Sequence, residues 1–262
     1  MENKTKNHNS ERAKSIGLIG FGNFGKLICK HLTLNGINVF VTDVSNKAKE
    51  AKELGIEFVS LDEVCKQEII ILAVPMENFR EVLNKIKDKL REGTLILDVC
   101  SLKMFSCDLM NKILPTNIKI IGTHPLFGPQ SCPNSIEGMK IVLVNVRVKQ
   151  ETFAKVKEFC ENLGLKVIIS TAEEHDKQMA FSQALTHFIG QICNKINIQR
   201  VNMSTKTFGD LMNIVDIIRN DTPALFNNMQ TINPFAKEVR WNFVNAAKEL
   251  DAKLNSKRAE NV

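Results

Sequence analysis

The chain has 262 residues, of which 44% are hydrophobic, and a formal net charge of +6. This length supports one large or two modest globular domains, and no apolar run approaches the roughly 18–20 residues needed to cross a bilayer. The lysines are dispersed, whereas nucleic-acid binding favours a concentrated basic stripe. We therefore expect neither nucleic acid nor membrane as a partner, and the mild positive charge suits an enzyme with anionic ligands.

The N-terminal segment and the cysteines indicate the compartment. Residues 1–14 are polar, carry two acids and lack an apolar stretch, which predicts a flexible arm rather than a secretory signal or transit peptide. The seven cysteines form no C-x-x-C pair and are best explained as free, mostly buried thiols in a reducing compartment. The sequence thus predicts a cytoplasmic protein. No carboxylate–histidine cluster has metal-ligand spacing, so no metal is expected.

A glycine-rich loop follows the first predicted strand, residues 15–19, and apolar residues with helical spacing follow the loop. Strand, G-x-G-x-x-G loop and helix together are the context that a dinucleotide-binding motif requires. The glycines let the backbone approach a pyrophosphate, and the helix N-terminus supplies unpaired N–H groups. The pattern predicts cofactor binding by Gly20, Phe21, Gly22, Asn23, Phe24 and Gly25.

The second predicted strand, residues 38–42, ends at Asp43. A carboxylate about 20 residues after the first glycine hydrogen-bonds the ribose 2′-hydroxyl of NAD and repels the 2′-phosphate of NADP. The alternative is an exposed turn aspartate, and the polar residues 45–47 could in principle hold a phosphate. We expect NAD or NADP as cofactor, with Asp43 favouring NAD. The chain has no tyrosine, which excludes the short-chain dehydrogenases, since these use a tyrosine as proton donor.

Five more apolar runs complete a seven-strand pattern in which helices alternate with strands. Strands are predicted at residues 68–75, 94–99, 118–122, 140–146 and 165–169, and helices at 78–90, 102–114 and 151–162. This alternation predicts an α/β fold with a doubly wound, parallel-type Rossmann sheet over residues 15–170. Val74 and Pro75, at the end of the third strand, are expected to contact the cofactor.

Helical periodicity replaces the alternation near residue 170, and no strand is evident beyond it. A capping box at residues 171–174 predicts a long helix to about Ile196, a second helix starts near Pro223, and a third spans 235–254. We predict a helical domain for substrate binding and dimerisation at 171–255 and a charged tail at 256–262. Helical domains of this size often pack against a second subunit, so a homodimer is expected.

Ser101 and His124 follow the fourth and fifth predicted strands, whose carboxyl ends meet at one edge of the sheet. Hydride transfer from a carbon that bears a hydroxyl needs a proton acceptor, and a histidine can exchange a proton near neutral pH. His124 is the candidate base, and Ser101 can hydrogen-bond the same substrate oxygen. His124 could instead cap a strand as a turn residue, and Ser101 could cap the helix at 102–114, a role that is compatible with substrate contact.

A further histidine, His187, occupies an apolar position twelve residues after His175, about 120° away on a regular helix. Its spacing alone is compatible with a core residue or a substrate contact.

Four motifs together resemble the prephenate and arogenate dehydrogenase family of tyrosine biosynthesis, over about residues 15–235. They are the glycine loop, D-V-C-S-L-K from Asp98, G-T-H-P-L-F-G-P from Gly122, and H-D-K-x-x-A-x-x-Q-x-x-x-H from His175. The T-H-P-L-F-G-P form and the segment 202–208 resemble the plant arogenate dehydrogenase branch. The resemblance implies an NAD(P)-dependent oxidative decarboxylation of a cyclohexadienol, which loses a hydride and CO₂ as its ring becomes aromatic.

The resemblance also implies residue roles. His124 would accept the proton and Ser101 would assist it, so both are catalytic candidates. The substrate-binding candidates are His187, Gln130, Gln183 and Asp221.

Two departures from the family pattern bear on the substrate. The arginine that binds the side-chain carboxylate in many bacterial members is replaced by Asp216 or Ile217, and a glutamate six residues after the catalytic histidine is replaced by Gln130. Asp221 matches an acidic position that goes with arogenate, whose ammonium group prephenate lacks. The pattern favours arogenate, giving tyrosine, over prephenate, giving 4-hydroxyphenylpyruvate. Arg219 and Arg240 are alternative carboxylate anchors, and both could equally be surface residues.

Two other interpretations stay open on the sequence. A two-domain β-hydroxyacid or imine-type dehydrogenase would share the pattern of the first 100 residues but would lack the His-Pro loop. A non-catalytic nucleotide-sensing protein would keep the fold, and only the intact Ser101 and His124 argue against it.

Overall fold

The computed structural model describes residues 15–132, 135–219 and 221–259, with side chains up to 256. The chain divides into two compact units. Residues up to 100 together with 109–168 form the sheet unit, and residues 101–108 together with those from 169 onward form the helical unit. The transfer of residues 101–108 to the second unit has no signal in the sequence. The predicted arm at residues 1–14 lies outside the described residues.

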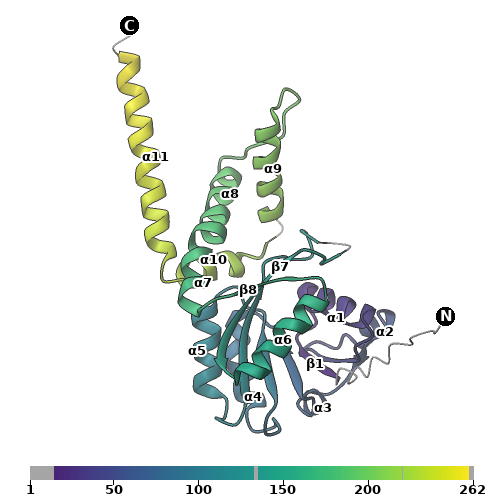
Figure 1. Ribbon diagram of the computed structural model, residues 1–262. Coiled ribbons are helices and arrows are strands. Elements are labelled where there is room, and N and C mark those ends of the chain that lie inside the picture. The colour runs from purple at the N-terminus through teal and green to yellow at the C-terminus, as the bar shows by residue number, and fades with distance from the viewer. Residues whose placement is uncertain (1–14, 133–134, 220, 260–262) are drawn as a thin grey trace, which may run out of the picture. The chain divides into compact units, whose positions relative to one another are not determined.

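One mixed sheet is the centre of the sheet unit, with strand order β3-β2-β1-β4-β5-β6-β7-β8 (Figure 1). From β3 to β6 all neighbours pair in parallel, and β6 and β7 pair antiparallel. The predicted doubly wound α/β fold is confirmed. The strands are β1 (Ile16–Ile19), β2 (Val39–Thr42), β3 (Glu57–Phe58), β4 (Ile69–Leu72), β5 (Leu95–Asp98), β6 (Lys119–Pro125), β7 (Lys140–Arg147) and β8 (Lys166–Ile169).

The described sheet has eight strands rather than the seven expected, because β3 contains only two residues and gives no periodic signal. The expected end of the fifth strand, at residue 122, was also wrong, because the strand is longer. β6 continues to Pro125, because antiparallel pairing with β7 gives residues 122–125 backbone partners. His124 therefore lies within a strand, opposite Val142, and not in the loop after it.

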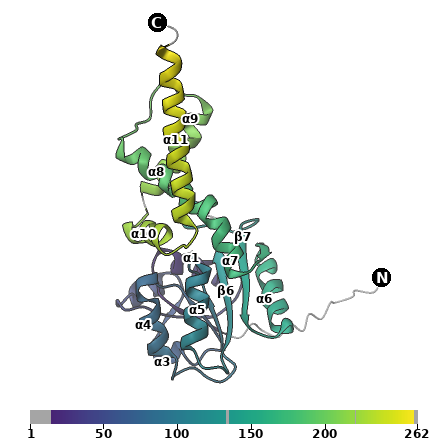
Figure 2. The same ribbon diagram turned by 90° about the vertical axis from the view of Figure 1, so that its left-hand side faces the viewer.

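Helices cover both faces of the sheet, as buried parallel strands require. α1 and α6 share one face, since residues of both pack against the same strands, and α4 lies on the other side (Figure 2). In α4 the residues Met76, Phe79, Leu83 and Ile86 form one buried stripe. The helices are α1 (Asn23–Leu34), α2 (Ala48–Glu53), α3 (Leu61–Val64), α4 (Met76–Ile86), α5 (Lys103–Ile113) and α6 (Gln150–Asn162).

The helical unit contains α7 (Ala172–Met179), a π-helix (Ala180–Leu185), α8 (Thr186–Lys195), α9 (Lys206–Arg219), α10 (Pro223–Thr231) and α11 (Ala236–Ala259). The single helix expected to Ile196 thus contains a π segment, a local widening that sequence periodicity does not reveal. The expected cap of α7 is present: Thr171 accepts a hydrogen bond from the Glu174 amide at 3.1 Å. α11 runs past the expected end at 254, because no breaker follows, and takes in part of the expected tail.

All seven cysteines are buried and none forms a disulfide. Burial raises the pKa of the Cys29 and Cys160 thiols to about 12 and that of Cys65 to about 11. These three thiols stay protonated and unreactive at neutral pH. Among the described residues, no helix combines the length and apolar character that a membrane span needs.

Candidate active site

The glycine loop between β1 and α1 has the geometry of a phosphate-binding turn. Gly20 has a φ of +104°, and a Cβ there would lie 2.3 Å from the carbonyl oxygen of Ala73. A Cβ at Gly25 would lie 2.2 Å from the Gly20 carbonyl oxygen. Both positions therefore require glycine, for conformation in the first case and for close packing of helix against strand in the second.

The middle glycine faces open space. A Cβ at Gly22 would meet no atom within 4 Å, and Gly22 is the N-cap of α1 with no side chain to accept the first-turn amides. An exposed loop followed by uncapped helix amides suits a pyrophosphate, because the helix N-terminus favours negative charge. The residues present here fit a dinucleotide.

Asp43 follows β2 and is held by the same loop. Its carboxylate accepts hydrogen bonds from the amides of Phe21 at 2.7 Å and Ser45 at 2.9 Å, and the Lys47 ammonium lies 3.4 Å away. Burial alone would raise the pKa of Asp43, but the two amide bonds and the charge of Lys47 outweigh it and leave that pKa lowered. An ionised carboxylate at this position can bind ribose hydroxyls.

The other expected cofactor residues lie around this loop and differ in exposure and in contacts. Asn23 is exposed, and Phe24 stacks at a tilt against Phe127 with ring centroids 6.3 Å apart. Val74, after β4, lies beside Gly20, and Pro75 is the N-cap of α4. The side chain of Phe21 is fully buried and supports the loop from the core side.

A buried carboxylate for which the sequence predicted no role, that of Asp98, fixes the part of β6 that precedes His124. Asp98, at the end of β5, accepts hydrogen bonds from the amides of Thr123 at 3.0 Å and Cys100 at 3.1 Å. The Thr123 hydroxyl also donates to the Asp98 carbonyl. These bonds fix the strand on the N-terminal side of His124, which is 6% exposed. The sequence did carry a signal for Asp98, because an acidic residue at the end of an apolar strand is unusual.

Ser101 belongs to the helical unit and His124 to the sheet unit, so their cooperation remains a prediction. α5 starts at Lys103, which makes Leu102 its N-cap, and the Leu102 carbonyl accepts the Ser106 amide. Ser101 therefore does not cap this helix, contrary to the alternative open on the sequence. Within the described chain its hydroxyl has no hydrogen-bond partner.

Three of the four expected substrate residues lie in the helical unit, each with a polar atom that is buried and unpaired. His187 Nδ1 and Asp221 Oδ2 are 3.2 Å apart but not aligned as a hydrogen bond, and Gln183 Oε1 has no partner. Gln183 lies in the π segment, so the 120° separation expected of His175 and His187 on a regular helix does not apply. Buried polar atoms without a hydrogen bond are rare in folded proteins, so these three positions are candidates for contact with a ligand.

A cavity of about 370 Å³ in the helical unit includes Asp221 and Arg219 in its lining. Arg219 also donates to Asn194 at 2.8 Å and to Asp216 at 3.2 Å. The other candidate anchor, Arg240, is engaged with the backbone and side-chain oxygens of Gln230. Of the two arginines, only Arg219 lines this cavity.

Gln130 lies on an exposed turn of the sheet unit, and none of the described side-chain contacts involves it. Its place among the substrate residues therefore gains no support from the described geometry. Among the described residues, no three metal-ligating side chains gather into a cluster.

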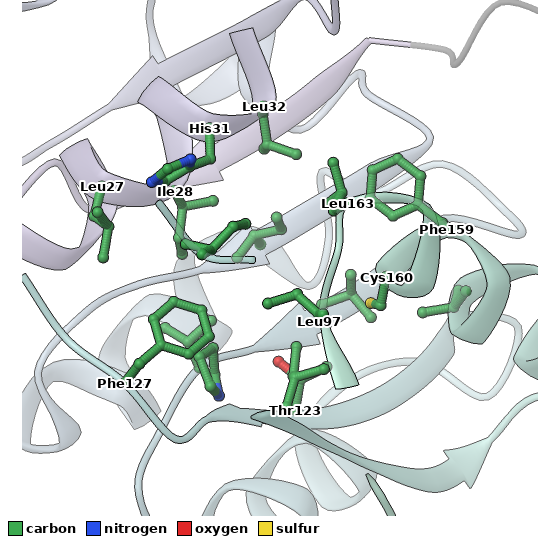
Figure 3. Close-up of a pocket in the computed structure, with 17 residues that line it drawn as sticks. Leu27, Ile28, His31, Leu32, Leu97, Thr123, Phe127, Phe159, Cys160 and Leu163 are labelled. Carbon is green, nitrogen blue, oxygen red and sulfur yellow. The ribbon is translucent and has the colours of Figure 1, made fainter. Parts of the chain in front are cut away.

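An apolar cavity of about 100 Å³ lies between α1 and α6 in the sheet unit (Figure 3). Thr123 and Pro125 line it, so His124, between them in the strand, points to the opposite face of the sheet. His31 also lines the cavity, and its buried Nε2 has no partner. This cavity is therefore separate from the predicted chemistry.

The strand order, the glycine loop and Asp43 define a Rossmann-type dinucleotide-binding protein with an added helical unit. The family model "Prephenate dehydrogenase, nucleotide-binding domain" matches residues 28–169, and a TYRAAT1-like C-terminal domain matches 192–262. The chain belongs to the prephenate dehydrogenase family.

Individual relatives agree with this assignment. Arogenate dehydrogenase 2 of Arabidopsis thaliana is 31% identical over 256 residues, which cover 93% of this chain and 72% of the relative. A probable arogenate/prephenate dehydrogenase of Methanocaldococcus jannaschii is 30% identical over 94% of this chain, which spans 58% of that relative.

Solved structures show the same fold. A prephenate dehydrogenase from A. aeolicus, in complex with hydroxyphenyl propionate and NAD⁺, has a TM-score of 0.75 at 23% identity and covers 94% of this chain and 93% of its own. Synechocystis arogenate dehydrogenase has a TM-score of 0.71 at 17% identity, with 93% of each chain covered.

Proposed function

We propose that this protein catalyses the NAD(P)-dependent oxidative decarboxylation of arogenate to tyrosine. The observation that carries the proposal is the placement of His124 in the sheet unit. β1, β2, β4, β5 and β6 run parallel, so the glycine loop, Asp43 and His124 all lie toward the same, carboxyl edge of the sheet. This is the edge at which such sheets bind ligands.

In this mechanism the chain binds, orients and accepts a proton. The open face at Gly22 and the α1 amides would hold the pyrophosphate, and the Asp43 carboxylate would hold the ribose. The bound oxidised nicotinamide supplies the hydride acceptor. The imidazole of His124 takes the proton of the substrate hydroxyl as the hydride leaves the same carbon, and Ser101 donates a hydrogen bond to that oxygen. The ring then releases CO₂ and becomes aromatic, so one proton acceptor and good positioning suffice.

The choice of arogenate rests on the helical unit. Arogenate carries an amino-acid side chain, with one carboxylate and one ammonium group. The cavity there presents a guanidinium from Arg219 and a carboxylate from Asp221, which match these two charges. Prephenate has no ammonium group to pair with Asp221, so its binding would leave this partly buried carboxylate with only the His187 ring, 3.2 Å away, beside it.

The choice of NAD rests on Asp43. Its lowered pKa keeps the carboxylate ionised, and a negative charge there repels a 2′-phosphate. Lys47, bonded to the Phe21 carbonyl at 3.1 Å, partly offsets that charge. We therefore propose a preference for NAD with residual use of NADP.

The test is the initial rate with each substrate and each cofactor, measured as NAD(P)H formation together with product identification. We expect kcat/KM to be highest for arogenate with NAD. A clear preference for prephenate would overturn the substrate assignment. Absence of NAD(P)H formation with both substrates would overturn the function and favour a nucleotide-sensing protein.

We also propose a homodimer formed through the helical unit. Every described residue of α11 from Ala246 to Ser256 is exposed, and Trp241 and Leu250 are exposed by 66% and 59%. Isolated helical segments of this length are marginal in water, so a second surface is needed to stabilise this one. A cytoplasmic location stays a prediction from composition.

A further inference from the structure

The start of α5 is capped by a residue that is distant in sequence. Asp176, in α7, is 1% exposed. Its Oδ1 accepts a hydrogen bond from the Lys103 amide at 2.8 Å, and its Oδ2 accepts one from the Met104 amide at 3.0 Å. All of these residues belong to the helical unit. A carboxylate at a helix N-terminus satisfies unpaired amides and interacts favourably with the helix dipole.

Asp176 is itself firmly held. His175 Nδ1 lies 2.7 Å from Asp176 Oδ1, and the Asn233 side chain donates to the Asp176 carbonyl at 2.8 Å. Because these groups are buried, the carboxylate has little freedom to leave the two amides.

The same two amides are the natural partners of Ser101. A serine that caps a helix accepts hydrogen bonds from the amides two and three residues further along the chain. For Ser101 these are Lys103 and Met104, the two that Asp176 takes. With those amides occupied, the helix starts at Lys103, and Ser101 stays outside it without a hydrogen-bond partner within the described chain.

We infer that Asp176 is a positioning residue: by taking the Lys103 and Met104 amides, it keeps the Ser101 oxygen from being drawn to the start of α5 and so leaves the Ser101 hydroxyl free to orient its O–H toward the substrate. The inference rests on the proposed function, because it assumes that Ser101 binds the substrate oxygen. Without the Asp176 carboxylate, α5 gains one residue at Leu102 and the Ser101 hydroxyl turns toward the helix.

The test is a double-mutant cycle between Asp176→Asn and Ser101→Ala, with arogenate and prephenate as substrates. An asparagine at 176 retains the volume but can accept only through one oxygen, so one amide is left for Ser101. We expect Asp176→Asn alone to lower kcat about tenfold, but less than about twofold in the Ser101→Ala background. The KM for NAD should change less than about twofold in either, since the glycine loop lies in the sheet unit.

Asn233→Ala is the matched control, because it removes a buried hydrogen bond to the backbone of Asp176 and leaves the carboxylate in place. It should lower the melting temperature without any coupling to Ser101→Ala. Equal losses from Asp176→Asn in both backgrounds would overturn the inference and leave Asp176 a purely structural residue. If Ser101→Ala itself has wild-type kcat, the proposed role of Ser101 fails, and the inference fails with it.

If Asp176→Asn does not fold, His175→Gln replaces it in the double-mutant cycle. This variant removes the imidazole that orients the Asp176 carboxylate, so it should lower kcat less and show the same coupling to Ser101→Ala. A loss without that coupling would again overturn the inference. A crystal structure of the Asp176 variant offers a direct check, since Ser101 Oγ should then lie within hydrogen-bond distance of the Lys103 or Met104 amide.

Discussion

The sheet unit and the helical unit differ in how many buried polar atoms lack a hydrogen bond and in how many large apolar side chains are exposed. In the sheet unit the buried Asp98 is hydrogen-bonded to the amides of Thr123, on the neighbouring strand, and of Cys100, and two described buried polar atoms, His31 Nε2 and Thr94 Oγ1, lack a partner. In the helical unit Gln183, His187 and Asp221 each bury a polar atom without a partner, and most of the large exposed apolar side chains belong to this unit.

This difference separates two tasks. The sheet unit can hold a catalytic group rigidly, because the bonds of Asp98 fix the strand that carries His124. Unpaired buried polar atoms and exposed apolar side chains in the helical unit are the features on which the proposed substrate contacts and the proposed dimer rest. We therefore expect the chemistry to depend on the sheet unit and the substrate choice and assembly to depend on the helical unit.

The largest expected effect is that of His124→Asn. Removal of a general base lowers kcat by about 10²–10⁴-fold. NADH binding, followed by its fluorescence, should be unchanged, because the glycine loop is untouched. His31→Asn, on the opposite face of the sheet, is the control and should retain kcat. Retention of more than a tenth of the activity by His124→Asn would contradict the mechanism.

Leu250→Glu should break the assembly. Burying a leucine side chain stabilises by about 1.5–3 kcal/mol, and a two-fold interface contains it twice, so the dimer Kd should rise by about 100-fold or more. Sedimentation at micromolar concentration measures this. Asn255→Glu, also exposed on α11, adds the same charge without removing an apolar group and should leave the dimer nearly intact. A monomeric wild-type protein would contradict the proposal at once.

Asp221→Asn should affect the binding of the substrate, measured by KM, more than the catalytic step, measured by kcat. Loss of the charge that pairs with the ammonium group should raise the KM for arogenate about tenfold, equivalent to about 1.4 kcal/mol. The KM for prephenate should change much less. Asp210→Asn, an exposed aspartate of α9 paired with Lys206, is the matched control. Equal losses for both substrates would show that Asp221 does not distinguish them.

His31→Leu should have the smallest effect, on stability alone. Burial, and then the charge of Lys30, lower the pKa of His31. The unfolded chain therefore binds a proton more readily than the folded one, so stability is lost as pH falls through about 6.5.

Leucine fits the apolar cavity and removes an unpaired nitrogen. The melting temperature should rise by a few degrees, more at pH 5.5 than at pH 7.5. His31→Gln controls for titration: it should remove the pH dependence but leave a buried polar group. An identical pH dependence in wild type and His31→Leu would refute this assignment.

Much of the sheet unit was predictable because its signals are local. The apolar runs predicted seven of the strands to within a few residues. The spacing of Gly20 and Asp43 predicted a dinucleotide site, and the hydrogen bond between Asp43 and the glycine loop fits it. The extension of β6 was not predictable, because it depends on pairing with β7, about 20 residues further along. The two-residue β3 carried no periodic signal at all.

The helical unit was less predictable for a related reason. Helical periodicity indicates that a helix exists but not where its hydrogen bonds change register, so the π segment at Ala180–Leu185 was missed. Gln183, His187 and Asp221 were selected through family resemblance. The structure adds that each buries an unpaired atom, but their roles toward substrate await the experiments above.

By itself the sequence determined the strand–helix alternation, the glycine loop and the carboxylate that follows β2, because each depends on neighbouring residues and on backbone conformations that only certain side chains allow. Only the tertiary structure decided that Asp98 fixes the strand of His124 and that Asp176 caps a helix 73 residues earlier in the chain. Those bonds join segments far apart in sequence, and they form only when the fold buries a carboxylate beside amides that have no other partner.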